Sequence, residues 1–377
     1  MIYLDNAATS AKKPLCVYGR FFYESLFSSI NAGRGAHKKS IRAIRLINET
    51  AESIAELFNI DDPADIAFMP NATYAINAAI HGVVKPGEHI ITTSMEHNSV
   101  LRTVSMLGNF TIVDADNMGY VNPLHIENAI KPETSLIICR HISNVTGSVQ
   151  PVEEIGQIAK QHNIHFLIDT AQSAGCYDIN AKEFNADLIA FSGHKGLLGP
   201  LGTGGLYVEN GVQLEPYITG GTGSMSESMI QPAFMPDMLH VGTLNSPAII
   251  ALGTAVRSLE SPSVTNNRES ELAKRFIDDL YSLEKVEVFG SRNRRRNGTV
   301  SFRIAGYDPA EIEDYLDRKK GIIVRSGYHC APLAHKTIGS SDTGTVRVSF
   351  GYYNTDYDRM IITDSIYELI KERNGRI

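Results

Sequence analysis

Short apolar segments of strand length alternate with segments of helical periodicity between residues 66 and 208. This alternation predicts a doubly wound, largely parallel sheet with helices packed on its faces. In such sheets a ligand binds beyond the carboxyl ends of the strands. The expected elements are strands at 66–69, 90–93, 111–113, 136–139, 165–168, 188–191 and 205–208, and helices at 72–84, 99–107, 123–130 and 151–162.

Two of the expected strands end in a lysine and an acid that suit one cofactor. Lys195 stands in the glycine-rich stretch 191–200, Phe-Ser-Gly-His-Lys-Gly-Leu-Leu-Gly-Pro, and Asp169 ends the apolar run before it. A lone lysine is commonly a solvated surface residue, so its pairing with Asp169 is what matters. Pyridoxal phosphate needs a lysine to hold it as a Schiff base and a carboxylate to keep its ring nitrogen protonated. The sequence therefore predicts a pyridoxal phosphate site built on Lys195 and Asp169.

Other polar residues at the strand ends have two interpretations each. The segment 70–73, Pro-Asn-Ala-Thr, precedes a helix and suits either a phosphate site or an ordinary helix cap. His97 follows a strand and is either a structural histidine or a ring that stacks on the cofactor. Asn144 either donates a hydrogen bond to the cofactor's phenolic oxygen or forms a turn before Gly147.

A second notable stretch is 325–335, Arg-Ser-Gly-Tyr-His-Cys-Ala-Pro-Leu-Ala-His. Cys330 stands beside a histidine and near Arg325, which favours the nucleophilic thiolate form. An inert loop cysteine is one alternative. A metal site made of His329, Cys330 and His335 is another, but a structural zinc site needs a fourth ligand and none is evident nearby, so no metal is expected. Arg347 lies in a short apolar strand and is expected to hold either a substrate carboxylate or a structural salt bridge.

The residue pattern of the chain changes after residue 211. Residues 218–229 are rich in Gly, Ser and Thr, which predicts a mobile loop, and the rest of the chain predicts a smaller α+β domain. We expect a large cofactor-binding domain at 14–255 and a small domain made of 1–13 and 256–377. The further expected elements are strands at 2–4, 286–289, 299–304, 322–324 and 346–350, and helices at 15–26, 40–58, 246–259, 267–283, 309–318 and 356–371.

Composition argues against several classes of partner. The 377 residues carry 35 Lys plus Arg against 42 Asp plus Glu, a net charge of −7, so no overall attraction to nucleic acid or to an anionic membrane is expected. The basic run at 292–296 is short and lacks interleaved aromatics, which favours a solvated loop. The first residues lack the charged-then-apolar layout of a signal peptide and no apolar run approaches membrane-spanning length, so neither a signal peptide nor a membrane span is expected. Its four cysteines form no CxxC pair, which favours a reducing, cytoplasmic compartment.

With these stretches in view, the chain resembles the class V aminotransferase family of fold type I pyridoxal phosphate enzymes, and within it the group II cysteine desulfurases. The resemblance covers nearly the whole length. It implies a large domain with a mainly parallel seven-stranded sheet and a small α+β C-terminal domain. The matching segments are 3–9 Tyr-Leu-Asp-Asn-Ala-Ala-Thr, 169–172 Asp-Thr-Ala-Gln, 192–195 Ser-Gly-His-Lys, 199–204 Gly-Pro-Leu-Gly-Thr-Gly, 325–330 Arg-Ser-Gly-Tyr-His-Cys and 347–355 Arg-Val-Ser-Phe-Gly-Tyr-Tyr-Asn-Thr.

The resemblance also implies roles for individual residues. Lys195 would carry the cofactor, Asp169 would pair with its ring nitrogen, and Gln172 would contact its phenolic oxygen. His97 would stack on the ring, and a Thr243 from the other subunit would reach the phosphate, which implies a homodimer with shared sites. The phosphate is expected to be held by Ala72, Thr73, Ser192 and His194. The substrate is expected to contact Asn144, Arg325, His329 and Arg347.

The activity implied by the resemblance is desulfuration of L-cysteine to L-alanine. Lys195 would move the α-proton, and Cys330 would accept the sulfur as a persulfide. A sulfur-acceptor protein would then take the sulfur from the enzyme. The alternatives are a selenocysteine lyase, a carbon–sulfur lyase, an aminotransferase acting on another amino acid, or a pseudoenzyme that binds no cofactor.

Overall fold

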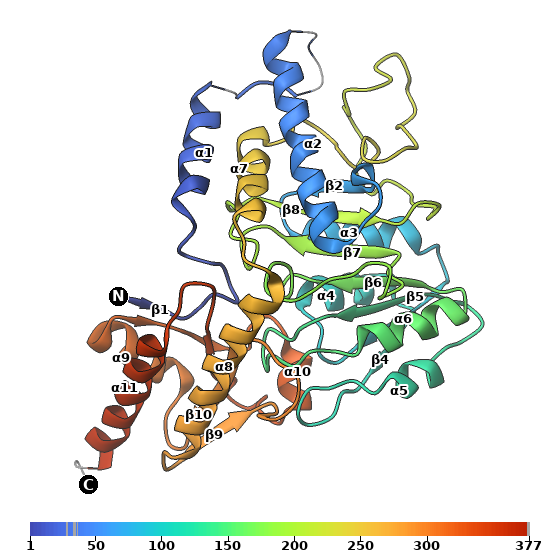
Figure 1. Ribbon diagram of the computed structural model, residues 1–377. Coiled ribbons are helices and arrows are strands. Elements are labelled where there is room, and N and C mark those ends of the chain that lie inside the picture. The colour runs from blue at the N-terminus through green and yellow to red at the C-terminus, as the bar shows by residue number, and fades with distance from the viewer. Residues whose placement is uncertain (28, 33–34, 36, 375–377) are drawn as a thin grey trace.

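The fold was described from a computed structural model, which describes residues 1–27, 29–32, 35 and 37–374. Its largest element is a seven-stranded sheet in the order β2-β8-β7-β6-β5-β3-β4 (Figure 1). Strands β7, β6, β5, β3 and β4 are parallel, whereas β8 is antiparallel to both of its neighbours. The strands are β2 Ile66–Met69, β3 His89–Thr93, β4 Phe110–Val113, β5 Thr134–Arg140, β6 His165–Asp169, β7 Leu188–Ser192 and β8 Gly204–Val208.

The strands of this sheet are buried on both faces. In β5, Ile138 packs with helices α3 and α4, whereas Ile137 and Cys139 pack on the opposite face with α2, α6 and α7. Successive strand residues point to opposite faces, so a strand covered on both sides needs an unbroken apolar run. The helices around the sheet are α2 Lys38–Phe58, α3 Ala72–Val83, α4 Asn98–Leu107, α5 Pro123–Asn128, α6 Val152–Gln161 and α7 Ser246–Arg257.

Helix boundaries follow local capping chemistry. Asn71 caps α3 by accepting a hydrogen bond from the main chain of Tyr74, and His97 caps α4 by accepting one from Ser99. Both caps follow a strand or a turn beyond the carboxyl edge of the sheet. They therefore direct the N-termini of α3 and α4 toward the region where the polar residues were expected to gather.

A second apolar core lies in the C-terminal part of the chain. It is built on a four-stranded sheet, β12-β13-β10-β9, and on helices α8, α9 and α11. The N-terminal strand β1 pairs with β11, and Leu4 packs into this core, so both ends of the described chain lie in the same region (Figure 1). The elements are β1 Ile2–Tyr3, β9 Val286–Phe289, β10 Thr299–Ile304, β11 Ile322–Ile323, β12 Arg325–Gly327, β13 Thr345–Ser349, α8 Pro262–Tyr281, α9 Pro309–Lys320, α10 Pro332–Thr337 and α11 Asp356–Asn374.

The remaining elements are helix α1 Leu15–Phe27, which packs on α7, and the short 3-10 helix η1 Pro63–Asp65. The segment 209–245 contains neither helix nor strand and forms long loops, in line with the loop expected at 218–229. None of the helices within the described residues is long and apolar enough to cross a membrane.

The predicted fold class is confirmed, with three local differences. The strand expected at 322–324 is two strands: β11 pairs with β1, whereas β12 pairs with β13. Helix α8 begins at Pro262, five positions before the expected start, because a proline at the first helical position needs no N–H partner. Helix α10 was not expected, since its 6 residues are too few for a periodic pattern to show.

Candidate active site

Lys195 lies in a tight turn directly after β7. Gly193 bonds to the carbonyl of Thr203 across 2.8 Å, and a side chain at Gly193 would meet the Thr203 hydroxyl at 2.3 Å, so only glycine fits there. The lysine is half-buried, and burial is the largest cause of the lowering of its amine pKa to about 8. Asp169 opposes this lowering, whereas the charges of Arg140, Arg347 and Arg325 contribute to it. A neutral amine is the form that can attack a carbonyl group.

Asp169 ends β6, the strand next to β7, and is 3% exposed. One carboxylate oxygen accepts a hydrogen bond from the main chain of Ala171 at 2.9 Å, and the other faces the Arg140 guanidinium at 3.5 Å. These partners fix the orientation of the carboxylate. The prediction that Asp169 and Lys195 follow neighbouring parallel strands is confirmed.

The N-terminus of α3 is lined with donors. The main-chain N–H of Ala72 meets the Ser192 hydroxyl at 3.2 Å, and the Thr73 hydroxyl meets that of Ser99 at 2.9 Å. A side chain at Gly204 would lie 2.8 Å from the Cα of Asn71, so the neighbouring strand passes this turn closely. The helix N-terminus thus combines N–H groups with hydroxyls, which suits a phosphate.

His194 and Gln172 make contacts with the N-terminal segment of the chain. His194 Nδ1 lies 3.1 Å from the Thr9 hydroxyl, and Gln172 Nε2 donates to the carbonyl of Ala7 at 2.8 Å. Burial lowers the pKa of His194 to about 4, so its ring is neutral. Gln172 also lines a cavity of about 40 Å³, together with Lys195 and Glu269.

His97 is the N-cap of α4. Its Nδ1 accepts a hydrogen bond from the Ser99 main chain at 3.0 Å and lies 2.7 Å from the Ser99 hydroxyl. Burial and the charge of Arg140 lower the pKa of His97 to about 4, so the ring is uncharged at neutral pH. A neutral ring held by one edge is free to present its flat face to a ligand.

Cys330 is half-buried in a strained turn. His329 and Cys330 both have left-handed backbones, with φ of 49° and 58°, which is costly for residues with side chains. Their carbonyls are held from two sides: Asn144 Nδ2 donates to His329 at 2.6 Å, and the Asn98 main chain donates to Cys330 at 2.8 Å. Arg325 Nη2 lies 3.5 Å from the Cys330 sulfur, so the cation expected near this cysteine is in contact with it.

The histidines near Cys330 do not form a metal site. His329 Nε2 bonds to the Thr345 hydroxyl at 2.9 Å, and His335 Nδ1 bonds to the Ser340 hydroxyl at 2.8 Å. Across the part of the chain that the structure describes, no group of three metal-ligating side chains was found. His329 is 2% exposed, so its ring presents no open face to a substrate, contrary to the contact expected from the sequence.

Arg347 makes the structural ion pair that was its alternative interpretation. It is 1% exposed; its Nη2 pairs with Asp5 at 2.5 Å, and its Nη1 donates to the Asn144 carbonyl at 3.1 Å. Its charge nevertheless acts on Lys195 and His329, since it lowers the pKa of both. A substrate carboxylate bound at Arg347 would share this guanidinium with Asp5.

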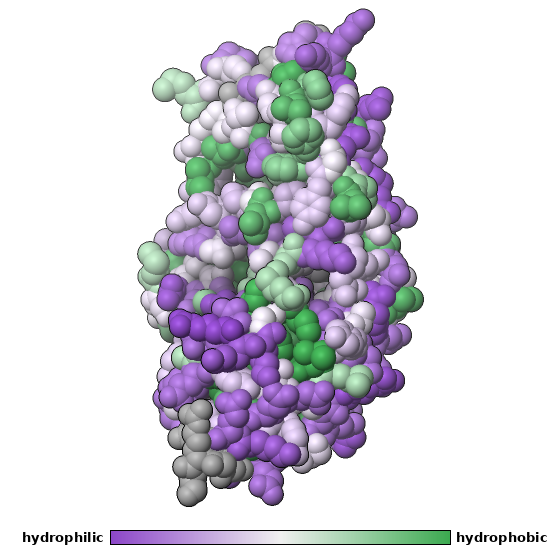
Figure 2. Space-filling model, turned by 90° about the vertical axis from the view of Figure 1, so that its left-hand side faces the viewer, coloured by the Kyte–Doolittle hydropathy of each residue, from purple (hydrophilic) through white to green (hydrophobic). Residues whose placement is uncertain are grey.

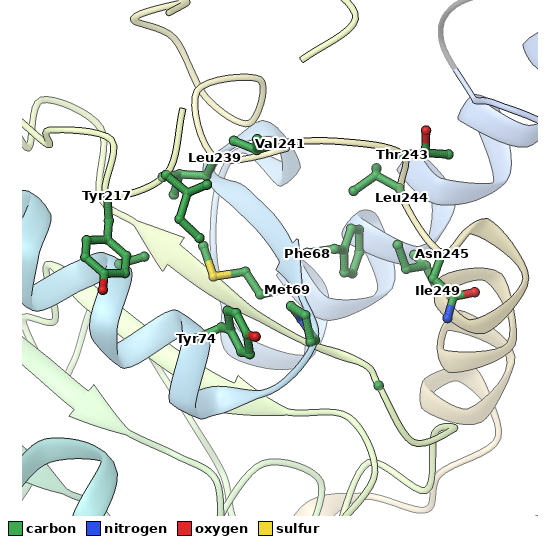
Figure 3. A pocket seen from close by; sticks show the side chains of 14 residues that line it. Phe68, Met69, Tyr74, Tyr217, Leu239, Val241, Thr243, Leu244, Asn245 and Ile249 are labelled. Carbon is green, nitrogen blue, oxygen red and sulfur yellow. The ribbon is translucent and has the colours of Figure 1, made fainter. Parts of the chain in front are cut away.

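Thr243 lies apart from the other predicted site residues. It is exposed, in the loop before α7, and lines an apolar cavity of about 300 Å³. Figure 3 shows this loop, from Leu239 to Leu244, passing Met69 and Phe68. Among the described residues that line the cavity, Thr243 is the only member of the predicted site. Within a single chain, Thr243 therefore does not complete the group around Lys195.

One central residue was missed from the sequence. Arg140 ends β5, is 1% exposed, and its guanidinium contacts Asp169, Asn144 and the carbonyl of Met95. A charged residue at the end of an otherwise apolar run, Leu136 to Cys139, was the available signal. A buried arginine needs several partners, and these only become visible once the strands are adjacent.

The sequence profile of the family described as aminotransferase class-V matches residues 2–358. The chain belongs to this family. Its curated relatives include a probable cysteine desulfurase of Methanothermobacter thermautotrophicus, 34% identical over 98% of this chain and 94% of the relative. A probable cysteine desulfurase of Pyrococcus abyssi is 32% identical over 98% of this chain and 94% of the relative.

Solved structures of family members agree with the fold. A cysteine desulfurase of Thermococcus onnurineus superposes with a TM-score of 0.92 at 32% identity, over 98% of this chain and 95% of that chain. A cysteine desulfurase of Escherichia coli superposes with a TM-score of 0.87 at 24% identity, over 98% of this chain and 94% of that chain, and supports the fold alone. The family resemblance seen in the motifs is thereby confirmed.

Proposed function

We propose that this chain is a pyridoxal phosphate-dependent cysteine desulfurase that converts L-cysteine to L-alanine and receives the sulfur on Cys330 as a persulfide. The observation that carries the proposal is the position of Cys330. Its sulfur lies beside Arg325, and its loop is held against the start of the helix that His97 caps. The names of the relatives support the same activity.

The residues present fit pyridoxal phosphate. The N-terminus of α3, with Ala72, Thr73 and Ser192, offers N–H and hydroxyl donors to a phosphate. The Lys195 amine, with its lowered pKa, suits the aldehyde, and the Asp169 carboxylate suits the ring nitrogen. When bound, the cofactor serves as an electron sink for a carbanion at the substrate α-carbon. His97, His194 and Gln172 would complete its surroundings.

Cationic groups next to Lys195 would hold the substrate. Arg347 and Arg325 both act electrostatically on Lys195, and a carboxylate is the natural partner of a guanidinium. Asn144 would orient the substrate from its place between Arg140 and His329. Lys195, as a neutral amine, would accept and return the α-proton.

The sulfur transfer balances without an added oxidant or reductant. The Cys330 thiolate attacks the substrate sulfur and forms the S–S bond, while the Cβ–S bond of the substrate breaks. The electron pair of that bond stays on the carbon, which takes up a proton and becomes the methyl group of alanine. The product on the enzyme is a Cys330 persulfide, which a sulfur-acceptor protein would then reduce. This chemistry requires a reduced thiol, in keeping with the cytoplasmic compartment that we propose.

We propose further that the enzyme is a homodimer with shared sites, in which Thr243 of each chain serves the phosphate site of the other. Two features support this. Thr243 is exposed and isolated within its own chain. Helix α1 exposes a row of large apolar side chains, on the face that Figure 2 shows. The most exposed of these residues are Leu15, Phe22, Leu26 and Phe27.

The domain limits that we propose are 14–255 for the large domain and 1–13 with 256–377 for the small one. The separation of the apolar cores supports them. Leu4 packs with the C-terminal strands and helices, whereas α1 packs on α7 and the residues of α2 and α7 pack against the large sheet.

The activity is tested by incubating the yellow holoenzyme with L-cysteine and a reductant, and by measuring sulfide and alanine together. Equal amounts of both, lost in Cys330→Ala and retained in the exposed-cysteine control Cys16→Ala, would support the proposal. Pyruvate in place of alanine would indicate a carbon–sulfur lyase. Turnover that survives Cys330→Ala would indicate an aminotransferase, and a preference for selenocysteine would indicate a selenocysteine lyase.

A further inference from the structure

A single buried guanidinium lies between the groups that the proposed reaction uses. Arg140 ends β5, the strand between β6 and β3 in the sheet. Its Nη2 faces the Asp169 carboxylate at 3.5 Å, and its Nη1 donates to the side chain of Asn144 and, at 3.1 Å, to the carbonyl of Met95. Glu96 accepts a hydrogen bond from the Arg140 main chain at 3.0 Å, so the residue is held at both ends.

Asn144 extends this contact toward the Cys330 loop. Its Oδ1 accepts from Arg140 while its Nδ2 donates to the His329 carbonyl at 2.6 Å. The carbonyl of His329 belongs to the left-handed turn that presents Cys330. An unbroken chain of polar contacts thus runs from Asp169 through Arg140 and Asn144 to the residue before Cys330.

Burying a charged side chain at this position costs desolvation free energy, which its contacts must offset. Arg140 is 1% exposed, its Nε has no partner among the described residues, and an apolar side chain would pack there without desolvating a charge. A planar fork, in contrast, can hold two acceptors in fixed directions at the same time. Arg140 uses its two terminal nitrogens on two different parts of the site, Asp169 and Asn144.

We propose that Arg140 is a positioning residue that couples Asp169, on the cofactor side, to the Cys330 loop, on the sulfur-accepting side, through Asn144. This inference rests on the proposed function, because it assigns Asp169 and the Cys330 loop to the same reaction. Arg140 does not touch the reacting atoms. Its role is to keep the sulfur acceptor and the cofactor carboxylate in one fixed arrangement.

The electrostatic environment agrees with this assignment. The positive charge of Arg140 lowers the pKa of Lys195 and of His97, so it favours the neutral form of each group. Removal of the charge would therefore act on the cofactor side as well as on the loop. A lysine at this position would retain the charge but could not span both acceptors.

The chain offers a matched control in Arg296. It too is a buried arginine, 3% exposed, but its guanidinium donates only to main-chain carbonyls, among them those of Ser291 and Thr146. Arg296→Met therefore removes a buried guanidinium of the same kind without touching Asp169 or Asn144. The Arg296→Met variant therefore shows how much stability is lost when a buried guanidinium is removed elsewhere in the protein.

The test compares Arg140→Met, Arg140→Lys and Arg296→Met with the wild type by two readouts that need no turnover. The first is the dissociation constant of pyridoxal phosphate, from equilibrium dialysis of the apoprotein. The second is the rate at which iodoacetamide alkylates Cys330, followed by peptide mass spectrometry so that the exposed Cys16 is counted separately. Thermal unfolding records the stability of each variant.

We expect Arg140→Met to weaken cofactor binding at least about tenfold, as for a lost hydrogen bond to a charged group, and to accelerate Cys330 alkylation severalfold. Arg140→Lys should retain most of the cofactor affinity but still accelerate alkylation, and it tests the coupling if Arg140→Met does not fold. Arg296→Met should change stability only. Equal effects of Arg296→Met and Arg140→Met, or a change in Arg140→Met confined to one readout, would overturn the proposal.

The two proposals fail in different ways. If the wild type binds the cofactor and shows this coupling but releases no alanine from L-cysteine, the proposed function fails and the role of Arg140 stands. If the wild type desulfurates L-cysteine while Arg140→Met keeps both its cofactor affinity and its Cys330 alkylation rate, the role of Arg140 fails and the function stands.

Discussion

The main-chain N–H of Asn98 donates to the carbonyl of Cys330 across 2.8 Å. This bond joins the first turn of α4, which His97 caps, to a loop more than 200 positions later in the chain. Together with the Asn144 contact to His329, it holds two consecutive left-handed residues in place. The proposed sulfur acceptor is thus fixed against the large sheet before any substrate binds. Less conformational entropy is then lost when the Cys330 loop is positioned for the reaction.

Replacing Cys330 should separate cofactor binding from sulfur transfer. In Cys330→Ala, desulfuration should fall on the order of 10³-fold or more, because the nucleophile that accepts the sulfur is gone. The visible band of the bound cofactor should remain, since Lys195 and Asp169 are unchanged. Simultaneous loss of the band would show that Cys330 is needed for cofactor binding or folding rather than for sulfur transfer.

Lys195→Ala should abolish the yellow band of the holoenzyme without added amine, because the covalent link to the cofactor cannot form. Lys13 is the competing lysine, since burial also lowers its pKa to about 8 and its amine donates to the carbonyl of His194. Borohydride reduction of the wild type, followed by peptide mapping, should place the cofactor on Lys195. Labelling of Lys13 instead would refute the assignment.

The rate at which the apoprotein combines with pyridoxal phosphate should depend on pH. The Lys195 pKa of about 8 means that the neutral amine increases about tenfold per pH unit below that value and levels off above it. Asp169 opposes the lowering, whereas Arg140, Arg347 and Arg325 add to it. Stopped-flow absorbance should show a rising rate with a plateau above about pH 8; a rate that keeps rising to pH 10 would contradict the lowered pKa.

Glu269 should make the stability of the protein depend on pH. Burial raises its pKa to about 8, so the folded protein retains a proton that the unfolded chain releases above about pH 4.5. The stability contributed by this protonated carboxyl is therefore complete at low pH and is lost as the pH rises through about 8. Glu269→Gln mimics the protonated form, so it should stabilise the protein at pH 9 but not at pH 4.

Urea unfolding at both pH values measures this effect. A gain of at least about 1.4 kcal/mol is expected at pH 9, which corresponds to one unit of raised pKa. The nearby Glu271→Gln is the control, because Glu271 is exposed and pairs only with Arg275. A gain in Glu269→Gln that is equal at pH 4 and pH 9 would show that burial of the charge is not its cause.

The proposed dimer predicts that an exposed residue far from Lys195 controls cofactor binding. Phe22 on α1 is 66% exposed, so Phe22→Glu should convert the dimer to a monomer in light scattering and weaken cofactor affinity. Thr243→Ala should weaken cofactor affinity while leaving the dimer intact. Met360→Glu, on α11, is the control for an exposed apolar side chain and should alter neither property. A wild-type monomer with full cofactor occupancy would end the shared-site proposal.

Much of this protein could be predicted from its sequence, because the relevant signals are local. The apolar runs identified the seven strands of the large sheet, and the alternation with helices predicted its parallel core. Lys195 and Asp169 were found because both follow strands, and the carboxyl ends of parallel strands meet at one edge of a sheet. Cys330 and Arg325 were found because they are close in sequence and their chemistry is matched.

Only the tertiary structure decided the roles of residues whose partners are distant in the chain. Arg140 gains its partners when β5 lies beside β6 and its loop reaches Asn144, and Glu269 becomes a buried acid only when α8 packs behind Lys195. Arg347 was predicted as a cation, but its pairing with Asp5 depends on a contact across 342 positions. Local pattern determines which elements form, whereas burial and distant contacts determine the charge and the partners of each side chain.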